Sequence, residues 1–228
     1  MADKKKLEAA LEKKALYGED IDLSKYDDND EARTKSTEDL TAGGKSKLAK
    51  VGIELDGEGR SATFIQVDNT PVQVEVDKET PLELMNTGDA AKKHPELVEK
   101  YWWKAVAPDT DKYTAKTATE REQGYFIRVR AGHKITAPLQ ACIFIGHEDQ
   151  LQRVHNVVII EEGAELNIIS GCASDPSVEN GVHIGISEFF VEKGAKLSFT
   201  MIHNWGENVA VRPRTVAIVG EDAQYTSN

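Results

Sequence analysis

Two side chains of the segment SGCASDPSVENGVHIGIS, residues 170–187, are of types that can do chemistry. They are Cys172 and, eleven positions later, His183. A thiolate is a nucleophile and a soft metal ligand, and an imidazole is a base or a ligand. A zinc ion or an iron–sulfur cluster needs about four such ligands, and the chain shows no further cysteine or histidine at ligand spacing. On the residues alone, the favoured interpretation of Cys172 is a small buried hydrophobe.

Alternation along the flanking strands predicts where these two side chains point. The aliphatic residues of VHIGIS alternate with His183, so if they fill the core, the imidazole points outward. Cys172 has the parity of Leu166, which predicts an inward thiol. The pair is therefore not expected to face each other. Cys142, in the aliphatic run QACIFIG, is predicted to be a core residue.

The elements around these residues repeat along the chain. The segments FIRVRAGHKIT, VVIIEEGAELN and EFFVEKGAKLS align with Gly132, Gly163 and Gly194 at a constant spacing of 31 residues, and VAIVGEDAQYT follows with Asp222 at the equivalent position. Each copy is typical of a strand, a tight turn and a second strand, with glycine or aspartate where the backbone needs a positive φ. A fixed period in this range indicates a solenoid, and the absence of helix-length connections predicts coils of a parallel β-helix. An antiparallel sandwich of short hairpins is the alternative fold.

The first half of the chain is of a different kind. Residues 4–16 carry a narrow apolar stripe typical of a helix, and residues 19–47 offer few large apolar groups, so they are expected to be extended, mobile or ordered only by contact. Residues 61–76 predict a hairpin, and a second helix is expected from Pro95 to about Pro108. We therefore divide the chain into an N-terminal helical or α+β region, residues 1–112, and the first coils of a mainly β solenoid core, residues 113–228.

Composition excludes several classes of function. A net charge of −11 would repel nucleic acid, and no long apolar run predicts a membrane segment. Two cysteines make no disulfide framework, which favours a cytoplasmic protein. Gly44-Lys45-Ser46 lacks the preceding glycine of a phosphate-binding loop, and no C-x-x-C, H-E-x-x-H or G-x-S-x-G motif occurs.

Three stretches carry a family resemblance: PLQACIFI, VVIIEEGAELNIISGCASD and GVHIGISEFFVEKGAKLSFTMIHNW. They resemble the core of the SufB/SufD family of iron–sulfur cluster assembly proteins, over roughly residues 81–228. Gly171-Cys172-Ala173 resembles the glycine–cysteine turn of SufB, and His203-Asn204-Trp205 resembles its glutamine–asparagine–tryptophan stretch. The resemblance is therefore SufB-like.

The resemblance implies a right-handed parallel β-helix and a scaffold role in the Suf system, with no catalytic turnover of the chain's own. It implies a SufC-type ATPase as partner, together with a SufB/SufD-type partner chain or a second copy as homodimer. A transient iron–sulfur cluster is the implied cofactor, and Cys172 and His183 are carried over as positions for sulfur handling or cluster binding. Metal ligands are left unassigned.

Two alternatives remain beside this interpretation. One is a β-helix fragment that mediates protein interaction without a cluster. The other is a carbohydrate-acting β-helix protein that would use outward charges, for which Arg128, Arg130, Glu161 and Glu192 are the candidates. The last repeat also lacks a polar cap, so we expect an N-terminal part of a longer protein or an open end that pairs with another chain.

Overall fold

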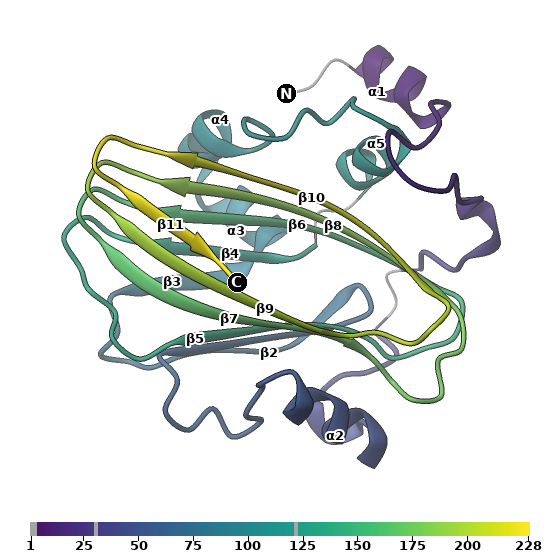
Figure 1. Ribbon diagram of the computed structural model, residues 1–228, viewed down its shortest axis with the longest axis horizontal. Helices are drawn as coiled ribbons and strands as arrows, with labels where there is room; N and C mark the ends of the chain where they lie inside the picture. The colour runs from purple at the N-terminus through teal and green to yellow at the C-terminus, as the bar shows by residue number, and fades with distance from the viewer. Residues whose placement is uncertain (1–3, 30–31, 121–122) are drawn as a thin grey trace.

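The computed structural model describes residues 4–29, 32–120 and 123–228. Parallel sheets form a β-solenoid of about three turns, with an N-terminal α/β region packed around it (Figure 1). Sheet A has the strand order β10-β8-β6-β4-β3, and sheet B has the order β11-β9-β7-β5-β1-β2. The mainly β fold predicted from the repeats is confirmed.

The strands of the two sheets have the following bounds. Sheet A contains β3 (Leu82–Asn86), β4 (Tyr125–Val129), β6 (Gln150–Ile160), β8 (Gly181–Val191) and β10 (Val209–Val219). Sheet B contains β1 (Ala62–Val67), β2 (Thr70–Val76), β5 (Leu139–Ile145), β7 (Glu165–Ser174), β9 (Lys196–Asn204) and β11 (Gln224–Ser227).

The sequence repeat is the coil of the solenoid. Strand β6 pairs in parallel with β8 over eleven residues, and β8 pairs in parallel with β10 over the same length. Gly132, Gly163 and Gly194 all have φ between 65° and 76°, and Asp222 has φ 56°, as the predicted turn requires. The amide of Gly163 donates to the carbonyl of Lys193 on the next coil at 2.9 Å, so the turns stack as well as the strands. These parallel pairs exclude the antiparallel sandwich.

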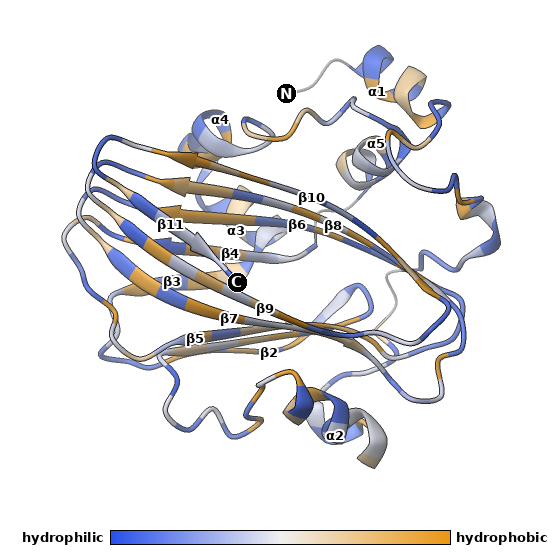
Figure 2. Ribbon diagram, in the orientation of Figure 1, coloured by the Kyte–Doolittle hydropathy of each residue, from blue (hydrophilic) through white to orange (hydrophobic). Residues whose placement is uncertain are grey.

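Apolar side chains fill two kinds of core. The main core lies inside the solenoid, where Leu166, Ile168 and Phe199 of sheet B meet Phe189 and Val158 of sheet A. Further clusters lie on the outer faces, beneath the N-terminal region. Both faces of several strands are therefore buried, and these strands are orange along much of their length in Figure 2.

The N-terminal region contributes five α-helices within the described residues, and they cover the outer faces of the sheets (Figure 1). Their bounds are α1 (Lys4–Leu11), α2 (Ala42–Lys50), α3 (Thr87–Lys93), α4 (Pro95–Tyr101) and α5 (Lys112–Thr119). The predicted hairpin is confirmed as β1 and β2, joined at Asp68 with φ 53°. Strand β1 also pairs in parallel with β5, so the hairpin extends sheet B. The division at residues 112 and 113 falls in the first turn of α5 and stays a prediction.

Two expectations about the N-terminal region are wrong. The helix from Pro95 ends at Tyr101, because Trp103 takes a positive φ of 55° and its amide donates to the carboxylate of Glu188. Residues 42–50 form α2 within a segment expected to lack structure of its own. Thr41 caps this helix by accepting from the amide of Gly44 at 2.8 Å, which the low helix propensity of Gly43 and Gly44 obscured.

The rest of the segment 19–47 is ordered by contact with the solenoid, except that residues 30 and 31 lie outside the described residues. Across the described ranges, no helix combines the length and the apolar content needed to cross a membrane.

Candidate functional site

Cys172 lies on the inner wall of the solenoid, as its parity predicted. The residue is 3% exposed and belongs to the main interior core. Burial raises the pKa of its thiol to about 12, and hydrogen bonds from the Ser170 hydroxyl and the Ile143 backbone only partly offset this effect. At neutral pH the thiol is therefore protonated, and it is a poor nucleophile in this conformation.

The second cysteine lies on the opposite face of the same sheet. Cys142 pairs in register with Gly171, one position away from Cys172, and it is fully buried beneath Leu48, Val51 and Ile53 of the α2 segment. Burial raises the pKa of Cys142 well above its usual value. Because neighbouring positions point to opposite faces, the two thiols do not form a disulfide.

The predicted outward orientation of His183 is wrong. The residue is 6% exposed, and its Nδ1 lies 2.8 Å from Gln152 Oε1. Its ring centroid lies 5.0 Å from that of Trp205, which packs against the interior core. Its aliphatic neighbours Val182, Ile184 and Ile186 fill a second core on the outer face, against α5. Both faces of β8 are thus buried, so an apolar row does not identify the interior face.

The hydrogen bonds fix the proton on His183. Gln152 Nε2 donates to the carbonyls of Asp68 and Phe144, at 2.8 and 2.9 Å, so its Oε1 is the atom that faces the imidazole. His183 Nδ1 must therefore carry the proton and donate it to Gln152. Burial lowers the pKa of His183 to about 3, with a further contribution from nearby His203, so the ring is neutral at pH 7.

Trp205 links the two candidate residues. Its ring lies 5.0 Å from His183 and 6.3 Å from His203, and His203 pairs in register with Cys172 across β7 and β9. The structure thus brings Cys172 and His183 to a shared interior. Our sequence reasoning missed Gln152, although it lies one repeat, 31 residues, before His183 and so marks the same position on the preceding coil.

The residues present do not form a metal centre. Within the parts of the chain that the structure describes, no three His, Cys, Asp or Glu side chains gather as metal ligands would. The interior near Cys172 offers one thiol and the His183 imidazole, whereas His203 is exposed, and the thiol is protonated. A resident iron–sulfur cluster therefore does not fit this site, and a cluster is better treated as the cargo of an assembly reaction.

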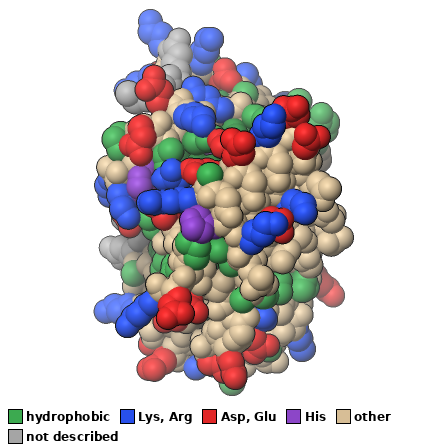
Figure 3. Space-filling model, turned by 90° about the vertical axis from the view of Figure 1, so that its left-hand side faces the viewer, with side chains coloured by type: hydrophobic (Ala, Val, Ile, Leu, Met, Phe, Trp, Pro, Cys, Tyr) green, Lys and Arg blue, Asp and Glu red, His purple; other side chains and the backbone are tan. Residues whose placement is uncertain are grey.

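The outward charges considered for a carbohydrate site are used in ion pairs. Arg128 contacts Glu161 at 2.6 Å and Glu83 at 3.3 Å, Arg130 contacts Glu83 at 3.1 Å, and Glu192 contacts Lys100 at 3.1 Å. Figure 3 shows this end of the molecule, where acidic and basic side chains are intermixed on the surface.

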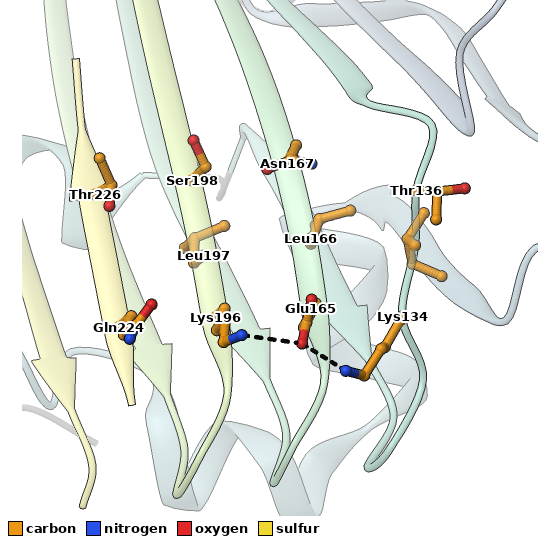
Figure 4. A pocket seen from close by; sticks show the side chains of 11 residues that line it. Lys134, Thr136, Glu165, Leu166, Asn167, Lys196, Leu197, Ser198, Gln224 and Thr226 are labelled. Carbon is orange, nitrogen blue, oxygen red and sulfur yellow. Dashed lines mark ion pairs between the residues drawn. The ribbon is translucent and has the colours of Figure 1, made fainter. Parts of the chain in front are cut away.

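A shallow groove of about 440 Å³ lies on the outer face of sheet B (Figure 4). Lys134 and Lys196 both contact Glu165 Oε1, at 2.8 and 3.4 Å, so this row presents one net positive charge. A second row of small polar side chains runs beside it, among them Asn167 and Ser198. The groove is on the opposite face of the sheet from the Cys172 thiol.

These features define the class of protein: a parallel β-solenoid that carries a buried thiol and a neutral imidazole on its inner wall. Comparison with known proteins gives the family. Residues 143–228 match the family described as SUF system FeS cluster assembly, SufBD core domain. This match contains both Cys172 and His183.

Relatives extend the match to the N-terminal region. The chain is 46% identical over 231 residues to an iron–sulfur cluster assembly SufBD family protein of Methanothermobacter thermautotrophicus, covering 98% of this chain and 56% of the relative. It is 47% identical over 184 residues to a SufBD family protein of Archaeoglobus fulgidus, covering 81% and 49%. It is 32% identical over 133 residues to the iron–sulfur cluster assembly protein SufB of Bacillus subtilis, covering 58% and 29%. The chain belongs to the SufBD family and spans about half the length of the curated relatives that it matches.

Proposed function

We propose that this chain is a scaffold component of the Suf machinery, which works with a SufC-type ATPase and a SufB/SufD-type partner chain or a second copy. In this proposal it assembles iron–sulfur clusters as cargo, has no turnover of its own, and acts in the cytoplasm. The family membership supports the assembly role, and the inward thiol on β7 is the single observation that carries a role in sulfur handling.

The environment of Cys172 specifies what sulfur handling requires. In the proposed step, the Cys172 thiolate attacks the outer sulfur of a donor persulfide. A new sulfur–sulfur bond forms at Cys172, the donor's bond breaks, and the donor leaves as a thiolate. A pKa of about 12 and 3% exposure disfavour this step in the closed solenoid. Delivery therefore requires the donor to reach the interior and a base to take the thiol proton.

Within this proposal, His183 supplies an uncharged imidazole to the solenoid interior. Its Nδ1–H is committed to Gln152, which leaves Nε2 with a lone pair. This lone pair is a potential proton acceptor, but burial lowers the pKa of the ring to about 3, so it is a weak base toward the thiol until the interior opens to water. The Trp205 ring, at 5.0 Å between centroids, packs against this imidazole and limits its rotation.

The test uses the purified full chain, iron and sulfide under anaerobic conditions, and the SufC-type ATPase of the same organism. We expect capture of the ATPase and visible absorption on reconstitution. Cys172→Ser is expected to lose the absorption, whereas Cys142→Ser, on the outer face of the same sheet, is expected to retain it. In a separate incubation with a small-molecule persulfide as donor and without iron, the persulfide on Cys172 would appear by mass spectrometry as one added sulfur atom.

The other outcomes separate the alternatives. Capture of the ATPase without absorption, or with absorption unchanged in Cys172→Ser, would indicate a solenoid that mediates interaction without a cluster. Failure of both capture and reconstitution would overturn the proposal.

A further inference from the structure

An acidic segment of the N-terminal region crosses the outer face of sheet A. We call residues 16–28, LYGEDIDLSKYDD, the acidic strap, because they carry five carboxylates and one lysine. Their composition predicts no stable structure of their own. In Figure 1 this segment runs from α1 past α5, along the outside of the solenoid.

Basic side chains of the solenoid and α5 hold the strap. Lys112 contacts Asp20 at 2.7 Å, and Lys116 contacts Asp28 at 2.6 Å. The Arg212 guanidinium donates to the carbonyl of Glu19 at 2.8 Å. The surface beneath the strap is therefore basic in a chain whose net charge is −11.

Apolar contacts anchor the middle of the strap. Ile21, Leu23 and Tyr26 pack against the outer core that contains Val182 and Ile184. None of the strap residues is buried, whereas both residues of the core beneath are fully buried. Segments with few buried groups and many exposed polar contacts have a low local stability and can open while the body of the protein stays folded. The strap is of this kind, with one backbone bridge from Asp27 to Gln150 at its end.

We propose that the acidic strap is releasable, and that the surface beneath it is a docking site for a partner segment of the same chemistry. This partner segment carries carboxylates at both ends, to meet Lys112 and Lys116, and two or three apolar side chains between them. The strap occupies the site until the partner replaces it. The inference does not depend on cluster assembly, and its test contains no iron or sulfide.

The first experiment measures amide hydrogen exchange of the wild-type chain at low and high salt. The two ion pairs are partly exposed, and salt screens them. We expect exchange in residues 16–28 to rise about tenfold, because both ion pairs weaken, while exchange in β6 and β8 is unchanged. Exchange in the strap that is as slow as in β8 at every salt concentration would overturn the proposal.

The second experiment measures docking in trans. The probe is a fluorescent peptide of residues 16–28, added to the double variant Asp20→Lys, Asp28→Lys and to the wild-type chain. We expect the peptide to bind the variant at least tenfold more tightly, because reversed charges release the resident strap. A scrambled peptide of the same composition is the control, and Lys196→Glu, on sheet B, is the matched control variant.

Equal binding of the native and scrambled peptides would show a merely electrostatic attraction and contradict a docking site. Equal binding of the peptide to the wild-type chain and the double variant would show that the strap does not occupy the surface. Either result overturns the proposal.

Discussion

At the scale of single residues, burial decides what Cys172 and His183 can do. Both side chains face the solenoid interior, and burial shifts both toward the neutral form, with pKa values of about 12 and about 3. The interior therefore holds a thiol and an imidazole that are both uncharged at neutral pH. The hydrogen bond from His183 to Gln152 defines the tautomer, and it depends on a glutamine whose two N–H groups are already committed to backbone carbonyls.

The neutral state of His183 predicts a pH dependence of stability. The unfolded chain binds a proton at about pH 6.5, whereas the folded chain does not until about pH 3. Folding stability is therefore lost as the pH falls from 6.5 toward 3, at about 1.4 kcal/mol per pH unit for this group. We expect His183→Gln to reduce this slope, as measured by urea unfolding at pH 7 and pH 5.

His133→Gln is the control for this prediction, because His133 is exposed on a turn. An unchanged slope in His183→Gln would show that the interior admits a proton, and would remove the neutral imidazole from the proposed site.

At the scale of elements, the docking of α2 explains the glycine next to Cys172. A Cβ at Gly171 would lie 2.7 Å from Val51 Cγ2, 2.9 Å from Ile53 Cγ1 and 3.0 Å from the carbonyl of Val51. The segment after α2 thus packs directly on the backbone of β7. Hydrogen bonds from Lys47 to Asn204, at 2.8 Å, and from Thr41 to Asp175, at 2.5 Å, fix the same helix across two coils.

Gly171→Ala is therefore expected to displace the α2 segment. The cost is about 1–3 kcal/mol of unfolding free energy, as for other overpacked sites. Gly181→Ala is the matched control, because the nearest atom to its Cβ would be at 3.5 Å. Alkylation of Cys142, which α2 covers, should be faster in Gly171→Ala than in Gly181→Ala. Equal alkylation rates would mean that the cover does not depend on this glycine.

At the scale of the whole molecule, two buried carboxylates fasten the N-terminal region to the solenoid. Glu188 accepts from the amides of Trp103, Ala105 and Val106 at 2.6–2.9 Å and contacts His155 Nε2 at 2.7 Å. Burial opposes its ionisation, but these donors keep the pKa of Glu188 below its usual value.

Asp111 also fastens the N-terminal region to the solenoid, through Arg214 of the next strand of sheet A, β10. It accepts from the amide of Leu16 at 3.2 Å and from Arg214 of β10 at 2.6 Å, while also capping α5. Burial opposes its ionisation, but these donors keep the pKa of Asp111 below its usual value too. Each carboxylate therefore joins the N-terminal region to a strand of sheet A.

Glu188→Gln is expected to cost about 3–5 kcal/mol of unfolding free energy at pH 7, because it removes the charge from a buried pair and replaces the oxygen that accepts from the Trp103 amide by an NH2 group. The ionised Glu188 carboxylate stabilises the folded chain above the unfolded pKa of about 4.5. This stabilisation is lost as the pH falls through the lower pKa that Glu188 has in the folded chain. The difference in unfolding free energy between wild type and Glu188→Gln should therefore decrease at low pH, as measured by urea unfolding from pH 7 to pH 4.

Glu165→Gln, in the exposed pairs of Figure 4, is the control and should change the free energy of unfolding far less than Glu188→Gln does. If the difference in unfolding free energy between wild type and Glu188→Gln stays constant with pH, Glu188 does not join the N-terminal region to the solenoid as an ionised group.

The sequence by itself determined the coil, its turns and the inward thiol. Local chemistry specifies these features: glycine or aspartate at a positive φ every 31 residues, and a period of two along each strand. Only the tertiary structure decided the orientation of His183, because the outer core beneath α5 buries Ile184 and Ile186 as completely as the solenoid interior would have done. It also decided the docking of α2 and the strap, whose contacts join residues up to 193 positions apart. The local sequence pattern does not indicate which surface a segment far along the chain will cover.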